Sequence, residues 1–252
     1  MRKTIQELSY EIIRDSWPNL TSMRILDVGA GGAGTLAKKL ADDGADVTAL
    51  EYHPPETHVG KVKFVAHDLN QATLPFETAT FDALVSTEVL EHLRAPFCVL
   101  TEMVRVLKPG GMMVLTIPNY WNIKYRIKYL LTGNFQRPII NNRVARKGYL
   151  AGLAPHLNSI TFPTLKAVLT WEGCDKFSLH ASRIFNLGQR FAYLPFLSLI
   201  RLTMYFRSKK QRLLNLLDET NGPAALLGRR HILVKCFKQK RNGNGHVGVE
   251  RS

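Results

Sequence analysis

Cysteine is scarce in this chain of 252 residues, which holds only three. They lie far apart, each inside an apolar stretch, and their spacing fits neither a disulfide framework nor a zinc site. This excludes a disulfide-stapled secreted scaffold. We expect buried free thiols at Cys98, Cys174 and Cys236 in a reducing compartment.

Long apolar runs are also lacking. The best candidate, residues 191–206, spans sixteen positions and contains Pro195 and Arg201, whereas a transmembrane helix needs about 20 apolar residues. The amino-terminal stretch MRKTIQELSY is polar and has the pattern of a helix, not that of a secretory signal. Both features predict a cytoplasmic protein.

Acidic residues are rare in the second half of the chain. Residues 1–118 hold 11 Lys and Arg against 15 Asp and Glu, a formal charge of −4, while residues 119–252 hold 23 against 5, a charge of +18. This asymmetry predicts an anionic partner, which nucleic acid, a phospholipid surface or a phosphorylated substrate would each satisfy.

The first half contains a regular alternation of short β-rich runs and helical patterns. Two stretches, residues 34–43 and 89–107, have helical patterns, and the apolar runs around them are residues 23–28, 46–50, 62–66, 81–86 and 111–117. This rhythm predicts an α/β domain with a doubly wound parallel sheet, whose ligands bind beyond the carboxyl ends of the strands.

A glycine-rich turn follows the first of these runs, in LDVGAGGAGTLAKKL. Glycines at Gly29, Gly31 and Gly34 let the backbone approach a ligand closely. The second run ends in Glu51, which is placed to accept hydrogen bonds from both hydroxyls of a ribose. The pair predicts an adenosine-type ligand without deciding which one.

Two further stretches indicate which adenosine-type ligand is bound. They are FVAHDLNQATLPFETATFDALVSTEVLEHL and EMVRVLKPGGMMVLTIPN. With the glycine turn they resemble the class I S-adenosylmethionine-dependent methyltransferases, especially the branch of ubiquinone-biosynthesis and polysaccharide-cluster methyltransferases. The resemblance covers residues 20–120 and, weakly, the late stretch GRRHILVKCF. It implies a Rossmann-like, seven-stranded, mostly parallel sheet with a C-terminal helical insertion.

The resemblance also assigns cofactor residues. It implies that Asp27 and the glycine turn surround the methionine part of S-adenosylmethionine, that Glu51 binds the ribose, and that Asp68 with Leu69 meets the adenine. One position departs from the family pattern D-x-G-x-G-x-G, because Ala33 stands where the third glycine is usual and Gly34 follows it. The turn is therefore one residue longer than usual.

We divide the chain accordingly. Residues 1–118 are expected to form the cofactor-binding core, residues 119–237 to supply substrate-covering insertions and the last strands of the same sheet, and residues 238–252 to form a disordered tail.

The stretch EVLEHL brings acids and a histidine together. If a helix begins near Glu88, then Glu88, Glu91 and His92 share one face beside the methyl donor. The spacing resembles the E-x-x-E-H metal motif of small-RNA 2′-O-methyltransferases and some ubiquinone O-methyltransferases. It suits Mg²⁺ or Mn²⁺, with His156 as a fourth ligand. Alternatively the stretch is an ordinary solvent-facing turn, and His92 or His156 serves as a metal-free general base.

Two segments beyond the core are candidates for partner recognition. A predicted helix at residues 120–131 offers four possible substrate contacts, Tyr120, Trp121, Arg126 and Lys128, although its aromatic face also suits plain packing. Residues 191–206 are apolar and flanked by cations, which predicts a helix in the surface of an anionic membrane or, alternatively, a packed lid. The side chains expected to insert are Phe191, Leu194, Phe196, Leu197 and Phe206.

The sequence thus predicts an O-methyltransferase acting on a glycan or lipid-linked intermediate at the cytoplasmic face of the membrane. A quinone-type or other small-molecule methyltransferase is one alternative. An RNA-modifying or RNA-binding protein is another, although the basic residues lie among aliphatic runs and not on a stacking platform. A cofactor-binding protein without catalysis is the third.

Overall fold

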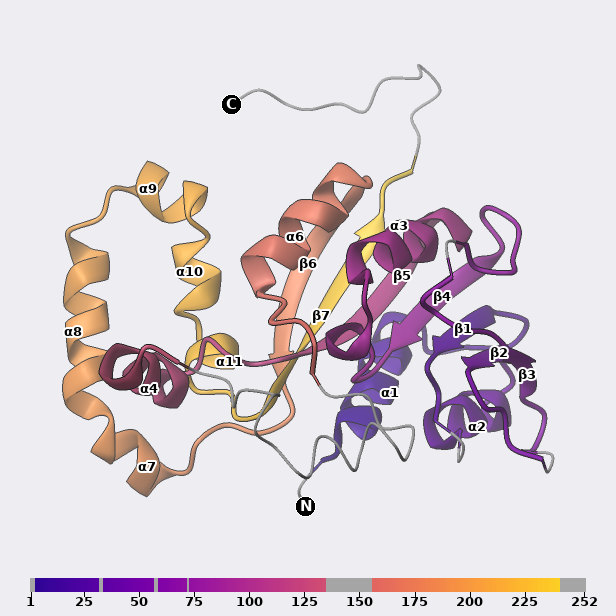
Figure 1. Ribbon diagram of the computed structural model, residues 1–252, viewed down its shortest axis with the longest axis horizontal. Coiled ribbons are helices and arrows are strands. Elements are labelled where there is room, and N and C mark those ends of the chain that lie inside the picture. Colours follow the sequence, from indigo (N-terminus) through magenta and orange to yellow (C-terminus); the bar gives the residue numbers. More distant parts are fainter. Residues whose placement is uncertain (1–2, 32–33, 57–58, 72, 135–155, 241–252) are drawn as a thin grey trace.

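A single seven-stranded sheet organises the computed structural model, which describes residues 3–240 except 32–33, 57–58, 72 and 135–155 (Figure 1). The strand order is β3-β2-β1-β4-β5-β7-β6. Strands β1 to β5 are parallel, and β7 is antiparallel to both β5 and β6. The predicted fold is therefore confirmed. The strands are β1 Arg24–Val28, β2 Asp46–Glu51, β3 Lys63–Ala66, β4 Phe81–Ser86, β5 Leu107–Pro118, β6 Cys174–Ala181 and β7 His231–Lys238.

Alternating side chains divide the core between the two faces of the sheet. Ile25 packs with helices α1 (Ile5–Ser16) and α2 (Thr35–Asp42) on one face, and the next residue, Leu26, packs with α3 (Pro96–Val106) and α6 (Phe162–Trp171) on the other. Strand side chains alternate in this way because the backbone is pleated. Both faces of the central strands are buried, which explains why their sequences are continuously apolar.

The predicted helix over residues 89–107 is confirmed for residues 96–106 and is wrong before Pro96. The chain forms a short 3-10 helix, η1 (Leu90–His92), and then α3, which begins only at Pro96. A residue that precedes proline is disfavoured in the helical region, and Ala95 accordingly has φ −128° and ψ 64°. Glu88 lies in the left-handed region, at φ +57°, so it belongs to neither helix.

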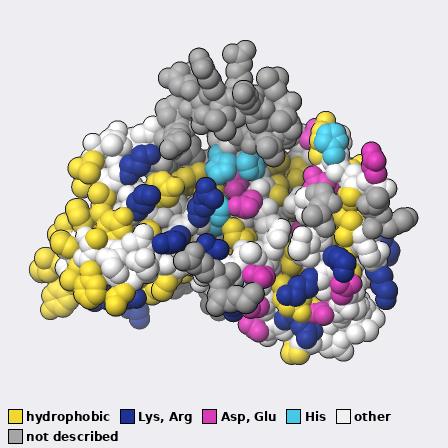
Figure 2. All heavy atoms as spheres, turned by 90° about the horizontal axis from the view of Figure 1, so that it is seen from below, with side chains coloured by type: hydrophobic (Ala, Val, Ile, Leu, Met, Phe, Trp, Pro, Cys, Tyr) yellow, Lys and Arg dark blue, Asp and Glu magenta, His cyan; other side chains and the backbone are white. Residues whose placement is uncertain are grey.

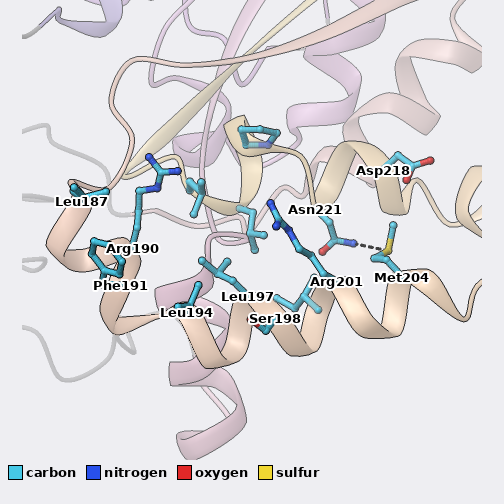
Figure 3. A pocket seen from close by; sticks show the side chains of 14 residues that line it. Leu187, Arg190, Phe191, Leu194, Leu197, Ser198, Arg201, Met204, Asp218 and Asn221 are labelled. Atoms are coloured by element: carbon cyan, nitrogen blue, oxygen red, sulfur yellow. Dashed lines mark hydrogen bonds between the residues drawn. The ribbon is translucent and has the colours of Figure 1, made fainter.

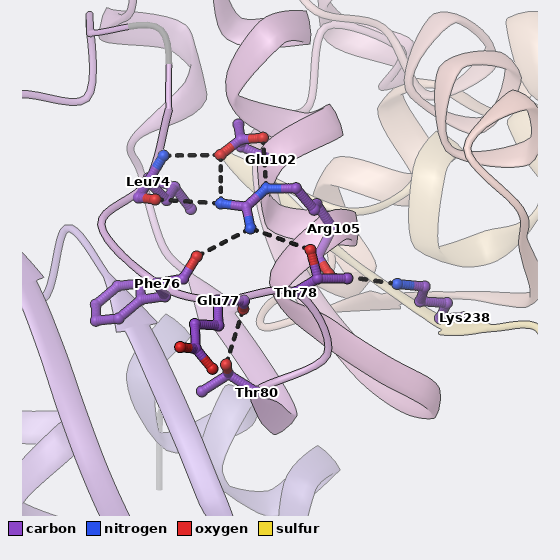
Figure 4. Close-up of polar contacts among 8 residues, drawn as sticks. All are labelled: Leu74, Phe76, Glu77, Thr78, Thr80, Glu102, Arg105 and Lys238. Carbon is purple, nitrogen blue, oxygen red and sulfur yellow. Dashed lines mark hydrogen bonds and ion pairs between the residues drawn. The ribbon is translucent and has the colours of Figure 1, made fainter.

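A polar network fixes the carboxyl end of α3 (Figure 4). Arg105 pairs with Glu102 at 2.7 Å and donates to the carbonyls of Leu74 and Phe76. Lys238, in β7, donates to the carbonyls of Val104 and Leu107 at 2.7 Å each. The expected tail therefore begins later than residue 238, and its residues 241–252 lie outside the described part of the chain.

A group of helices lies beside the sheet and is called the helical lobe here (Figure 1). Its members are α4 Ile123–Thr132, α7 Leu187–Ala192, α8 Leu194–Tyr205, α9 Lys209–Leu214, α10 Leu217–Thr220 and α11 Pro223–Leu226. Helix α4 follows β5, while α7 to α11 lie between β6 and β7. A small apolar cluster around Ile123, Phe185 and Leu226 holds the lobe together.

The two chain segments that join α7–α11 to the sheet are hydrogen-bonded to each other. Phe185 N donates to Leu227 O, and Arg229 N donates to Arg183 O, each at 2.9 Å. Residues 182–186 and 227–230, called the neck below, therefore run side by side.

The three cysteines lie in different environments. Cys174 and Cys236 are buried as expected, but Cys98 is exposed, so its predicted burial is wrong. A hydrogen bond with Cys174, together with burial, raises the pKa of the Cys236 thiol. Within the described residues, no helix is both long enough and apolar enough to cross a bilayer.

Candidate active site

The glycine turn after β1 is built around close contacts that exclude side chains. Gly29 has φ +72°, and a Cβ atom there would lie 2.3 Å from Val89 Cγ2. Its amide donates to Leu50 O at 2.8 Å, which ties the turn to β2. Gly31 and Gly34 also have positive φ angles, +70° and +51°. The extra residue of the turn, Ala33, falls outside the described residues.

Asp27, at the carboxyl end of β1, is buried without a neutralising partner. It is 1% exposed, and its Oδ1 atom has no hydrogen-bond partner among the described residues. Burial, reinforced by the negative charge of Glu51, raises the pKa of Asp27 to about 7. Such a carboxyl is suited to a cationic ligand group, because a positive charge would stabilise its ionised form.

Glu51 ends β2 and connects to the glycine turn. Its Oε2 atom accepts a hydrogen bond from Gly31 N at 2.7 Å, and its Oε1 atom accepts one from Tyr52 N at 3.0 Å. Each carboxylate oxygen has a further lone pair. The acid therefore remains able to accept hydrogen bonds from ribose hydroxyls.

Asp68 follows β3, the neighbour of β2. Its Oδ1 atom accepts hydrogen bonds from Asn70 N at 2.9 Å and from Asn70 Nδ2 at 3.1 Å, which orients the carboxylate. Leu69 is half-buried and packs against the core. The cofactor residues predicted from the sequence thus follow three adjacent strands, β1, β2 and β3, at the edge of the sheet where ligands of this fold bind.

A second group of side chains follows β4, where Glu91, His92 and His156 converge. One potential ligand atom from each lies within 4.8 Å of the others. The two imidazole rings meet edge to face, with their centroids 4.8 Å apart. The backbone explains the meeting, because Glu91 O accepts hydrogen bonds from Leu157 N at 2.7 Å and Asn158 N at 3.1 Å.

The electrostatics of this group are unusual for a surface turn. Glu91 is 1% exposed, and neither of its carboxylate oxygens has a hydrogen-bond partner in the described part of the chain. Burial raises its pKa. Burial and the nearby His92 and His231 lower the pKa of His156, so this imidazole is predominantly neutral at pH 7.

Glu88 stands apart from the group. Its amide donates to Thr116 Oγ1 at 2.7 Å, and its Oε1 atom lies 3.2 Å from His231 Nε2. The expected common helical face of Glu88, Glu91 and His92 is therefore wrong, because no helix begins at Glu88. His231 was not predicted as a site residue, although it begins the last strand of the stretch GRRHILVKCF.

The donors that converge favour a particular class of metal ion. One carboxylate and two imidazoles suit Mn²⁺ and similar first-row ions, whereas Mg²⁺ prefers oxygen ligands. Without a metal, a neutral imidazole beside a buried acid has the properties of a general base. Tyr120 Oη lies 3.4 Å from His156 Nδ1 and extends the group toward α4.

One predicted substrate contact is occupied by the protein itself. Arg126 donates to Trp121 O and Asn221 Oδ1 at 2.6 Å each and to Thr220 O at 2.5 Å, and burial lowers its pKa to about 10. Arg126 thus joins α4 to α10.

Figure 2 shows histidine and acidic side chains near the middle of one face, with Lys and Arg beside them toward the helical lobe.

Comparison with known proteins agrees with this geometry. Residues 26–115, from β1 to β5, match the family model described as "Methyltransferase domain". The chain contains a class I S-adenosylmethionine-dependent methyltransferase domain. This methyltransferase domain includes Asp27, Glu51, Asp68 and Glu91, whereas His156 and His231 lie outside it.

Curated relatives match the same part of the chain. The demethylmenaquinone methyltransferase of Renibacterium salmoninarum is 37% identical over 109 residues, which cover 41% of this chain and 45% of the relative. The ubiquinone biosynthesis O-methyltransferase of Xanthomonas oryzae is 32% identical over 109 residues, covering 40% and 45%. The chain thus spans about half the length of the curated relatives it matches.

Solved structures extend the likeness of fold to nearly the whole chain. A SAM dependent methyltransferase from Archaeoglobus fulgidus has a TM-score of 0.55 at 16% identity and covers 92% of this chain and 94% of its own. The S-adenosylmethionine dependent methyltransferase from Mesorhizobium loti has a TM-score of 0.52 at 17% identity, covering 90% and 96%. At these identities the likeness concerns the fold alone.

Proposed function

We propose that this protein transfers a methyl group from S-adenosylmethionine to a hydroxyl group of a small-molecule acceptor. The observation that carries the proposal is the contact between the two halves of the site. Val89 lies against Gly29 of the glycine turn. Glu91 and His92 follow two and three positions later and belong to the imidazole–carboxylate group. A proton acceptor therefore lies beside the expected methyl donor.

The reaction asks for alignment and for removal of one proton. The acceptor oxygen attacks the sulfonium methyl group, an oxygen–carbon bond forms, the sulfur–carbon bond breaks, and S-adenosylhomocysteine leaves. The hydroxyl proton passes to a neutral imidazole, for which His156 is suited by its lowered pKa. Holding the two reactants in line supplies much of the rate enhancement, since it removes the entropic cost of their encounter.

The helical lobe supports an acceptor with an apolar portion. A cavity of about 470 Å³ lies between α7–α8 and α10–α11 (Figure 3). Apolar side chains dominate its lining, including Leu187, Phe191, Leu194 and Leu197. A lipid-linked intermediate or its glycan precursor is the acceptor we propose. A quinone-type acceptor is the second candidate, favoured by the printed names of the curated relatives.

We also propose that the lobe docks on the inner, cytoplasmic face of an anionic membrane. Helix α8 has no buried residue, although Leu197 and Ile200 pack inward against the lobe's own cluster. On its outer side, Leu199 and Leu202 are 58% and 54% exposed. A helix with apolar side chains on two opposite sides needs a second apolar environment. Cations near it, Arg190, Arg201, Arg207, Lys209 and Lys210, suit anionic headgroups.

Methyl transfer into a lipid extract tests the enzymatic proposal. Purified protein with S-adenosylmethionine carrying a labelled methyl group should label a component of membrane lipids, and His156→Ala should remove the labelling while its S-adenosylhomocysteine affinity stays unchanged. Labelling of isolated quinone precursors in place of lipid-linked intermediates would favour the second candidate. Failure of calorimetry to detect S-adenosylmethionine or S-adenosylhomocysteine binding would refute the proposal.

A further inference from the structure

A large basic cavity lies between the neck of the helical lobe and the edge of the sheet. Its volume is about 770 Å³. Side chains from the amino terminus, α4 and the neck line it, and five of them are cations, Lys3, Lys124, Arg183, Arg229 and Arg230. The lining contains one acid, Glu88, which pairs with His231 of the same lining.

The arginines of this cavity lack acidic partners. Among the described residues, no carboxylate lies within ion-pair distance of Arg183, Arg229 or Arg230, whereas Lys3 pairs with Glu11 at 2.7 Å. Glu88, the one acid of the lining, lies 3.2 Å from His231 and is already engaged. Positive charges held together without compensation repel each other, and an anion relieves that repulsion.

Backbone hydrogen bonds anchor the residues that carry the three arginines. Arg229 N donates to Arg183 O at 2.9 Å, and Asn119 N donates to Arg230 O at 2.8 Å, so both segments of the neck are anchored. The Arg229 guanidinium is oriented by a hydrogen bond of 2.7 Å to Gln189 Oε1. The ordered Arg229 side chain lowers the entropic cost of binding an anion here.

The cavity also borders the reaction centre. Glu88 lines it, and the next residue, Val89, lies against Gly29 of the glycine turn. An acceptor held in the cavity therefore lies beside the segment that carries Glu91 and His92.

We propose that this cavity binds a phosphate or diphosphate group of the methyl acceptor and so directs the acceptor hydroxyl toward His156. Guanidinium groups bind phosphate oxygens with paired, charge-assisted hydrogen bonds, which favours phosphate at a site containing three arginines. The inference rests on the proposed methyltransferase function and names its substrate class, since a quinone ring carries no such group.

Calorimetric titration with inorganic diphosphate at 150 mM salt tests this inference. The protein should bind diphosphate saturably, and the double substitution Arg183→Gln with Arg230→Gln should weaken that binding at least tenfold. The matched control, Lys61→Gln with Lys176→Gln, removes the same charge from outside the cavity and should change the affinity less than twofold. S-adenosylhomocysteine affinity should remain the same in all three proteins, which also shows that they are folded.

The outcomes that overturn the inference are specific. Absence of diphosphate binding, or an equal loss in the control pair, would show that the cavity is no phosphate site. Arginine-dependent binding to phosphatidylglycerol vesicles without diphosphate binding would assign the cations to a membrane surface. If the unsubstituted protein does not bind S-adenosylhomocysteine, the proposed methyltransferase function is refuted. That result is distinct from the absence of diphosphate binding alone.

Discussion

The carboxylate of Glu51 accepts a hydrogen bond of 2.7 Å from the backbone amide of Gly31. The acid expected to bind the cofactor ribose therefore also holds the glycine turn in place. A change at either residue affects the other, because the turn and the acid share this bond.

Replacing Glu51 by alanine should weaken S-adenosylhomocysteine binding by about 1–3 kcal/mol, since ribose hydroxyls and the Gly31 amide would all lose an acceptor. Glu51→Gln keeps one carbonyl oxygen for Gly31 and should lose less affinity. Isothermal titration calorimetry measures both variants. An affinity equal to that of the unsubstituted protein would show that Glu51 does not contact the cofactor.

Asp27 should make the stability of the ligand-free protein fall between pH 4 and pH 7. An unfolded aspartate has a pKa of about 3.9, whereas burial raises the pKa of Asp27 in the folded protein to about 7. In that window the folded state keeps a proton that the unfolded state has lost, so the free energy of unfolding decreases as pH rises and levels off above pH 7. The difference is on the order of 1–4 kcal/mol.

Urea unfolding of the protein and of Asp27→Asn at several pH values measures this effect. The variant should lack the decrease and be the more stable protein at pH 7.5 without ligand. The same variant should bind S-adenosylmethionine more weakly, because it offers no negative charge to the cationic methionine part. If the free energy of unfolding changes with pH in the same way in both proteins, the raised pKa of Asp27 is contradicted.

The metal hypothesis predicts that a chelator abolishes methyl transfer and that Mn²⁺ restores it better than Mg²⁺, since two imidazoles converge with one carboxylate. Glu91→Ala, His92→Ala and His156→Ala should each reproduce the chelated state. Glu88→Ala is a suitable comparison because Glu88 pairs with His231 outside this group, and it should keep the response to Mn²⁺. Full activity in the presence of the chelator would refute the metal hypothesis. His92 or His156 would then act only as a general base.

The membrane proposal predicts different effects for two faces of α8. Leu199→Asp with Leu202→Asp should abolish binding to anionic vesicles while the thermal midpoint changes little, because both side chains are exposed. Leu197→Asp should instead lower the thermal midpoint, since Leu197 packs inward. Co-sedimentation with anionic and neutral vesicles at two salt concentrations is the measurement. Salt-sensitive binding to RNA but not to vesicles would favour the RNA alternative.

Local sequence patterns predicted the strands of the sheet, whereas the roles of the cofactor residues came from the family resemblance and stay predictions. The strands around Asp27 and Glu51 were predictable because each is a short apolar run whose burial on both faces leaves a direct signature. The position of Glu88 could not be predicted, because residues 88–107 have a pattern that suits one continuous helix. The chain instead breaks before Pro96, and Glu88 has a left-handed backbone conformation. The meeting of His92 with His156 was anticipated as a possible ligand pair, and its chemical role remains a prediction.

Long-range partners were beyond local reasoning. Arg126 was a candidate substrate contact because its segment was expected to cover the substrate side of the sheet. Its guanidinium instead bonds to Thr220 and Asn221, nearly a hundred positions later. Leu197 was expected to face a membrane together with Leu194. The structure places Leu197 inward, a distinction that depends on the packing of α8 against the rest of the lobe.

The neck of the helical lobe has an evolutionary consequence. Helices α7 to α11 leave the sheet and return to it through two hydrogen-bonded segments, so the excursion between them begins and ends at nearly the same place. An insertion with adjoining ends can be lengthened, shortened or exchanged without altering the strands that support it. Replacement of α7 to α11 during evolution can therefore change the specificity for the methyl acceptor while the cofactor-binding residues stay the same.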